Sequence, residues 1–257
     1  YNVVVGDEAG TAITTGDKNV AIGYQAGDAI TTGERSVYLG HTTGTSATDV
    51  DFNTGLGAEA LYTNVNGSRN VAVGNGALFA MNPASDTDTY NVAVGYDAGG
   101  AVTTGTNNTL IGGLAGDAIT TGESNVAVGK SALSANTTAA NNTAVGTNSL
   151  LVNTTGASNT SIGSGALAAN TTASNNTAVG LLALNSNTTG TENTSVGDSS
   201  SDANTTGSYN TALGRNSLGG NTTANHNTAI GRLAMLTNST GASNTAVGSG
   251  ALQSNTT

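Results

Sequence analysis

Residues 174–214 read SNNTAVGLLALNSNTTGTENTSVGDSSSDANTTGSYNTALG, and this stretch states one short pattern three times. NNTAVG, ENTSVG and YNTALG each end in a glycine, at Gly180, Gly197 and Gly214, so the pattern returns at every seventeenth position. The same aliphatic–glycine pair occurs fifteen times along the chain, and all but one of the intervals between successive pairs have this length. A fixed period over the whole length is typical of repeat architectures, in which each unit packs mainly on its neighbours.

Positions within the repeat are numbered from the asparagine that opens it, so that the glycine is position 5. Position 1 is Asn in fourteen repeats, with Ser36 as the exception, and position 4 is Val, Ile or Leu in all fifteen. Val or Thr at position 2 and a branched residue at position 4 alternate with other residues, which predicts a short strand. Alanine never replaces the position-5 glycine, which indicates a positive φ or a very close backbone approach.

The repeat predicts an all-β fold, because a glycine in every repeat, among Asn and Thr, would interrupt any helix. We expect a parallel β-solenoid of fifteen 17-residue coils, stacked about 4.8 Å apart. Positions 2 and 4 are expected to face the core, and the position-1 asparagines to form a stacked amide ladder. Residues 1–257 are expected to be one continuous solenoid segment of a longer chain. The single longer interval, between Gly74 and Gly95, places an insertion at 81–90.

Positions 9 and 12 vary together. Where position 9 is Gly, position 12 is aliphatic, and where position 9 is Leu, position 12 is Asn. The first set pairs Gly10, Gly27, Gly99 and Gly116 with Ile13, Ile30, Val102 and Ile119; the second pairs Leu133, Leu150, Leu167 and Leu184 with Asn136, Asn153, Asn170 and Asn187. We infer that the two positions border the same interior space, whose volume must stay filled.

Small residues at position 3 suggest that the strand face opposite the aliphatic pair is also covered. A second chain could cover it, so we expect a homo-oligomer, a trimer about a fibre axis.

The segments SNVAVG (124–129) and NVAIGYQA (19–26) resemble the head repeats of trimeric autotransporter adhesins, which carry an N-S-V-A-I-G-type motif. The resemblance covers essentially the whole chain, although the adhesin repeat is slightly shorter. It implies a trimeric, left-handed parallel β-roll with an extracellular attachment role. NTAVGxxALxxNTTGxxN units are also similar to repeats of bacteriophage tail fibres. The V-G-x-x-A-L spacing resembles the hexapeptide β-helix of acyltransferases too, but His41 and His226 lie at unrelated positions 6 and 17.

Composition limits the function classes. The net charge is −10, and thirteen of the sixteen acidic residues lie in residues 1–129, so nucleic acid and anionic membranes are not expected partners. The sequence has no cysteine, which removes thiol chemistry, and no apolar run long enough to insert into a membrane. We expect a non-enzymatic extracellular fibre at a cell surface or on a virion, without cofactor or metal. Its partners would be other copies of itself and a cell-surface glycan or protein receptor.

The insertion is the best candidate for a partner-binding loop, because loops that interrupt a regular scaffold often carry function. Its candidate residues are Phe79, Met81, Pro83, Asp86, Asp88 and Tyr90. Phe79 and Met81 could anchor a partner, although packing under the loop is the simpler explanation for these two residues. Pairs such as Asp49 with Asp51, or Asp86 with Asp88, could bind calcium, and His41 could join the first pair, but a solvated acidic loop accounts for them more simply.

Two further patterns follow from the repeat itself. Eight position-12 asparagines open N-x-S/T triplets and would accept glycans in a competent secretory system: Asn136, Asn153, Asn170, Asn187, Asn204, Asn221, Asn238 and Asn255. Stacked Thr-Thr rows raise an ice-binding solenoid as a minor alternative, although adjacent threonines on a strand point opposite ways. The other alternative is a purely structural filament, such as a tail-fibre shaft without its own ligand site.

Overall fold

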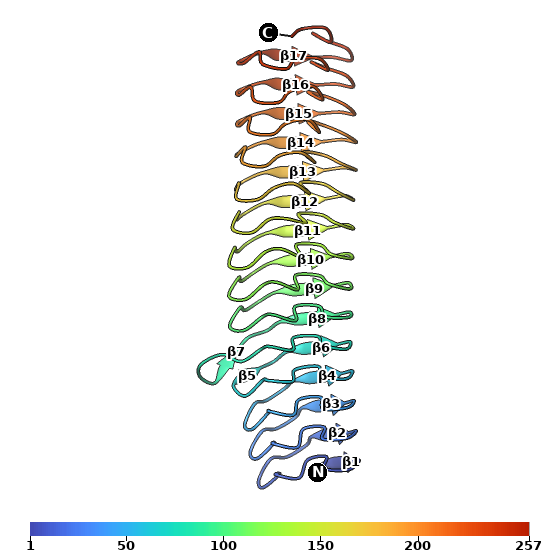
Figure 1. Cartoon of the computed structure of the whole chain (residues 1–257), viewed down its shortest axis with the longest axis vertical. Coiled ribbons are helices and arrows are strands. Elements are labelled where there is room, and N and C mark those ends of the chain that lie inside the picture. Colours follow the sequence, from blue (N-terminus) through green and yellow to red (C-terminus); the bar gives the residue numbers. More distant parts are fainter. Residues whose placement is uncertain (257) are drawn as a thin grey trace. The chain divides into compact units, whose positions relative to one another are not determined.

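The computed structural model describes residues 1–256, which form an all-β chain of two compact units, one spanning Tyr1–Ala127 and the other beginning at Val128. Each unit is a parallel β-solenoid, in which one short strand per coil lies above the strand of the coil before it (Figure 1). The described residues contain no helix, and therefore none that could span a membrane.

The strands occupy positions 2–4 of each repeat. In the first unit they are β1 (Val3–Val5), β2 (Val20–Ile22), β3 (Val37–Leu39), β4 (Thr54–Leu56), β6 (Val71–Val73), β8 (Val92–Val94) and β9 (Thr109–Ile111), with the short pair β5 (Gly67–Ser68) and β7 (Thr87–Asp88). The boundary between the units falls within β10 (Val126–Val128). In the second unit they are β11 (Thr143–Val145), β12 (Thr160–Ile162), β13 (Thr177–Val179), β14 (Thr194–Val196), β15 (Thr211–Leu213), β16 (Thr228–Ile230) and β17 (Thr245–Val247).

Successive strands within each unit pair in parallel with like repeat positions opposite each other. Val3 lies opposite Val20, and Thr160 lies opposite Thr177. The register survives the insertion, because Val71 of β6 still lies opposite Val92 of β8 although the longer repeat separates them. The solenoid and its 17-residue coil, predicted from the spacing of the glycines, are confirmed.

The strand faces are the reverse of the expectation. Position 3 is buried in fourteen of the fifteen coils, whereas no residue at position 2 or position 4 is buried. Positions 1 and 3 share the inward face, because side chains alternate along a strand. The interior of such a short coil is narrow, and positions 8, 9 and 12 fill its other side, so Ala or Ser suits position 3 better than a branched residue. The aliphatic residues at position 4 therefore line the outside of the sheet.

Two columns of buried asparagine hold neighbouring coils together. At position 1, the Oδ1 of Asn176 accepts the backbone N–H of Asn193 in the next coil (3.0 Å), and its Nδ2 donates to the Gly190 carbonyl (2.9 Å). The expected position-1 amide ladder is present at some coils, as where Asn108 Nδ2 donates to Asn91 Oδ1 (3.1 Å). A second ladder, not expected from the sequence, runs through position 12, where Asn187 Nδ2 donates to Asn170 Oδ1 (3.1 Å) and also to Gly190 O (2.9 Å). Each hydrogen bond satisfies a buried amide that would otherwise cost about 1–3 kcal/mol.

The shared interior of positions 9 and 12 is confirmed by the close packing around the glycines. A Cβ added at Gly27 would lie 2.6 Å from Ile30 Cδ1, and one at Gly116 would lie 2.8 Å from Ile119 Cδ1. The third repeat fills the same space with Tyr38, whose ring is fully buried next to Gly55. Burial raises the pKa of Tyr38 to about 12.

The position-5 glycine is required for two reasons at once. Its φ lies between +125° and +141° in every coil, a region that side chains strongly disfavour. A Cβ at Gly197 would also lie 2.6 Å from the carbonyl oxygen of Gly214 in the next coil. Both parts of the sequence-based interpretation are therefore confirmed.

Candidate functional site

A column of charged and aromatic side chains occupies position 17 in the first five coils of the first unit. From the first coil onward it consists of Lys18, Arg35, Phe52, Arg69 and Tyr90, and all five are exposed. We call these five residues the Arg–aromatic column. Each has a φ between +50° and +63°, so the left-handed turn at position 17 presents one side chain per coil to solvent.

The planar groups of this column stack on one another. The Arg35 guanidinium lies 5.4 Å from the centre of the Phe52 ring, and the Arg69 guanidinium, from the following coil, lies 4.6 Å from the same ring centre. Arg69 also lies 5.8 Å from the centre of the Tyr90 ring. Cation–π contacts at exposed sites contribute about 0.5–1 kcal/mol each, so the stack orders these side chains without burying them.

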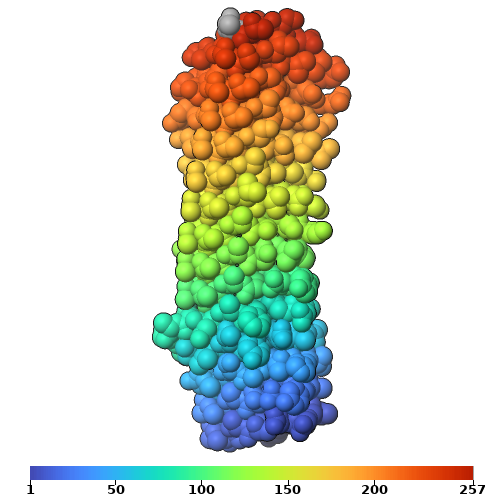
Figure 2. Space-filling model, viewed as in Figure 1, coloured from blue at the N-terminus to red at the C-terminus, as the bar shows by residue number. Residues whose placement is uncertain are grey.

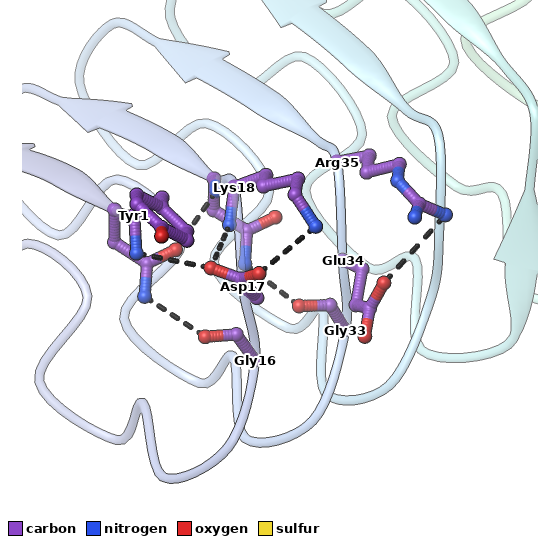
Figure 3. A network of polar contacts seen from close by, with 9 residues as sticks. Tyr1, Gly16, Asp17, Lys18, Gly33, Glu34 and Arg35 are labelled. Atoms are coloured by element: carbon purple, nitrogen blue, oxygen red, sulfur yellow. Dashed lines mark hydrogen bonds and ion pairs between the residues drawn. The ribbon is translucent and has the colours of Figure 1, made fainter.

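Acidic residues at the neighbouring position 16 balance the cations (Figure 3). Asp17 Oδ2 lies 3.0 Å from the Lys18 ammonium. Glu34 lies 3.6 Å from Arg35. These ion pairs are open to water, so each contributes little to folding stability.

The insertion, which supplies Tyr90 to this column, also places Asp88 beside it. It projects from the side of the first unit (Figures 1 and 2), and β7 within it pairs in parallel with β5, so that Asp88 lies opposite Ser68. Asp88 Oδ2 lies 2.8 Å from Arg69 Nε and accepts the Tyr90 hydroxyl at 3.2 Å. The hydrogen bond to Asp88 raises the pKa of the Arg69 guanidinium.

The structure divides the predicted loop residues into two groups. Met81 and Pro83 are buried, and the Pro83 carbonyl accepts from Asn66 Nδ2 (2.9 Å), so these two residues hold the loop in place. Phe79 is half-buried and stacks on Tyr62 with ring centres 5.0 Å apart. The exposed residues are Asp86, Asp88 and Tyr90.

The other candidate sites are not assembled in the described residues. Asp51 accepts the Glu34 amide N–H (2.7 Å), Asp49 accepts from the Thr48 hydroxyl, and His41 stacks on Tyr24 with ring centres 5.3 Å apart. No group of three or more His, Cys, Asp or Glu side chains lies close enough to hold a metal ion within residues 1–256. That part of the chain contains no pocket either.

The asparagines of the N-x-S/T triplets do not face solvent in the folded coil. From Asn136 to Asn238 the seven side chains are fully buried, and Asn255 is half-buried. The Nδ2 atom that would carry a glycan instead donates to a neighbouring coil or carbonyl, as in Asn204 (2.9 Å to Asn187 Oδ1). The geometry therefore opposes glycosylation of the folded coil at these seven residues.

The threonine rows form a single exposed file. Position-14 threonines such as Thr155 and Thr189 are exposed, whereas Thr154 and Thr188 at position 13 are half-buried and donate to the carbonyl of the next coil. Each of these coils therefore exposes one threonine of the pair rather than two, in agreement with the sequence-based expectation that adjacent threonines point in opposite directions.

A second surface of note is the outward face of the main strands. In each unit, position 4 places one Val, Ile or Leu per coil on this face, and none is buried. Leu39 and Ile162 are both 40% exposed. We call this row of position-4 residues the aliphatic stripe. No protein-family model matches the chain, and no curated protein sequence matches it.

Proposed function

We propose that the chain is a non-enzymatic segment of an extracellular fibre that mediates attachment to a surface or host, and that it works as a homotrimer. The observation that carries this proposal is the aliphatic stripe, which leaves a branched apolar residue at least partly exposed to solvent on every coil. Monomeric soluble proteins rarely leave a contiguous apolar surface of this kind open to water.

The repeat distance of the stripe favours a second copy of the chain as its cover. One aliphatic residue recurs per coil, at the strand spacing of about 4.8 Å. Only a partner with the same repeat can meet every coil in the same way, and another copy in parallel register does so. The resemblance to trimeric adhesin heads leads us to expect three chains whose aliphatic stripes pack together around a common axis. In that arrangement we expect the Arg–aromatic column to lie on the outer surface of the trimer.

Self-association is tested by the mass in solution, measured by light scattering. We expect three chains of 24.9 kDa each for the wild type. The triple variant Val145→Asp, Val179→Asp and Leu213→Asp places charges on the stripe and should shift the mass toward one chain while the strand signal in circular dichroism remains. The control Thr155→Asp, Thr189→Asp and Thr223→Asp changes exposed positions of the same repeats and should stay trimeric. A monomeric wild type would refute the assembly.

Attachment is tested with beads that carry the whole chain, by counting those retained on a panel of cell surfaces and polysaccharide coats. Residues 82–89 are replaced by the tetrapeptide Thr-Thr-Gly-Thr that stands at 103–106, which restores the regular coil length. Loss of retention would support a binding segment whose specificity involves the insertion.

A structural spacer is the competing function, and one observation favours it for the second unit. That unit carries three acidic and three basic residues in a frame of Asn, Ser and Thr, so its formal charge is zero, whereas the first unit carries thirteen acidic and three basic residues. If beads that carry the wild-type chain are retained on no surface, the result would favour a shaft without a ligand site.

A further inference from the structure

All three cations of the first unit lie in the Arg–aromatic column. The unit has thirteen acidic residues spread over many repeat positions, yet Lys18, Arg35 and Arg69 all lie at position 17. Later coils of the same unit place Asn107 and Ser124 there, so the turn itself requires neither charge nor an aromatic ring. The gathering of these groups on the outside is therefore a chemical feature of the surface rather than a demand of the fold.

Together with the carboxylates beside it, the Arg–aromatic column offers hydrogen-bond donors and acceptors side by side, and the positive and negative charges of this surface nearly cancel. Three cations stand next to the carboxylates of Asp17, Glu34, Asp51 and Asp88. A polyanion would meet these carboxylates, and a polycation would meet the guanidinium groups, so neither suits the column. A neutral partner rich in hydroxyl groups can donate to the carboxylates and accept from the guanidinium groups at the same time.

The width of the column also selects the partner. A protein interface of ordinary size buries about 800 Å² on each side and has a largely apolar centre. The column is one side chain wide, and guanidinium groups cover faces of its two rings, Phe52 and Tyr90. Such a file matches a single extended chain lying along it better than a second protein surface.

We infer that the Arg–aromatic column, completed by Asp88 of the insertion, binds a neutral oligosaccharide that runs along the coils. The inference rests on the proposed attachment function and names its ligand class. Coils about 4.8 Å apart present one side chain each, and one sugar of an extended β-linked chain advances by nearly the same distance. Successive sugars thus meet successive members of the column, with hydroxyls on Arg69 and Asp88 and ring edges against Phe52 and Tyr90.

The test uses the whole chain and an array of neutral oligosaccharides of two to six sugars, together with their sialylated and sulfated counterparts. We expect binding to neutral members that strengthens with length up to about five sugars, one per coil of the column. The double variant Phe52→Ala and Arg69→Ala should weaken binding of the best array member, measured by calorimetry, about tenfold or more. The control Tyr209→Ala and His226→Ala removes a stacked pair from position 17 of the second unit (ring centres 5.0 Å apart) and should leave affinity unchanged.

The outcomes separate this inference from the proposed function. Retention on cells without binding to any neutral oligosaccharide, or preference for the charged members, overturns the column as a neutral-glycan site while the attachment function stands. Equal losses in both double variants would also overturn it. Retention that is abolished by treating the cells with protease but not with glycosidases would assign the surface to a protein receptor. Absence of retention on every surface would remove the attachment function itself.

Discussion

Replacement of a single position-5 glycine by alanine should damage the solenoid far more than its one extra methyl group suggests. In Gly197→Ala, the new side chain would have to adopt a φ of +137°, which costs about 1–3 kcal/mol. Its Cβ would also lie 2.6 Å from the carbonyl oxygen of Gly214, so the two coils must separate locally. That movement weakens the hydrogen bond from Gly214 N–H to the Val196 carbonyl (2.8 Å), which joins these two coils, at a further cost of about 1 kcal/mol.

The expected loss in the free energy of unfolding is therefore about 2–4 kcal/mol, a large share of the stability of an ordinary domain. Equilibrium denaturation followed by circular dichroism measures it, and the melting temperature should fall by about 5–15 °C.

The matched control is Gly207→Ala at position 15, where the backbone φ is not positive. A Cβ there would also approach the Ala224 carbonyl oxygen, but alanine already occupies this position at Ala173 and Ala224, so the corner can move to admit it. We expect that control to lose no more than about 1 kcal/mol. Equal losses in the two variants, or a Gly197→Ala protein as stable as the wild type, would refute the reasoning.

Three further predictions concern the interior and its titration. Leu184→Gly and Asn187→Ile should each lower the free energy of unfolding of the second unit. The double variant recreates the Gly–Ile pairing of other coils, so its loss should be at least about 1 kcal/mol smaller than the sum of the two single losses. A double-mutant cycle on denaturation measures this difference. The buried Tyr38 has its pKa raised from 10.0 to about 12, so the folded state holds this proton more tightly, and stability contributed by Tyr38 should be lost as pH rises from 10 to 12. Tyr38→Phe should abolish up to about 2–3 kcal/mol of this decrease in the free energy of unfolding, measured by denaturation between pH 10 and 12. If stability falls with pH as steeply in the variant as in the wild type, the burial argument is contradicted. Partial burial raises the pKa of Asp202, so the free energy of unfolding should increase as pH falls through that raised value toward 3.8. Asp202→Asn should therefore stabilise the protein at pH 7 and make its stability less dependent on pH in this range.

The period of the sequence is sufficient to predict the solenoid, but it does not tell which strand face is inward. Alternation defines two faces, and hydrophobicity alone assigns the aliphatic position 4 to the core. The narrow coil reverses this assignment, because Asn at position 1 and Ala at position 3 fit an interior that a second row of branched residues would overfill. Tyr38 carried a usable signal: this large position-3 residue is followed by Gly44 at position 9 and by Gly55 at position 3 of the next coil, as an inward ring requires.

The same limit applies to the candidate site. Sequence reasoning selected the insertion as a unit, but it could not separate the buried Met81 and Pro83 from the exposed Asp88 and Tyr90, since burial depends on how the loop folds back on β5. Lys18, Arg35, Phe52 and Arg69 were missed because they lie outside the insertion, in coils of regular length. Their shared repeat position was the available signal, because stacking in register brings like positions together.

The central claim of this account is that like positions of successive repeats lie over one another, and cross-linking between introduced cysteines tests it most directly. The chain has no cysteine of its own, and position 14 is exposed. Coils about 4.8 Å apart place Thr172→Cys and Thr189→Cys within the roughly 4.4–6.8 Å Cα separation of a disulfide, whereas Thr172→Cys and Thr206→Cys lie two coils apart, at about 10 Å. We predict that mild oxidation closes the first pair within one chain and leaves the second pair as free thiols; equal rates, or closure of the second pair alone, would contradict the stacking of the coils.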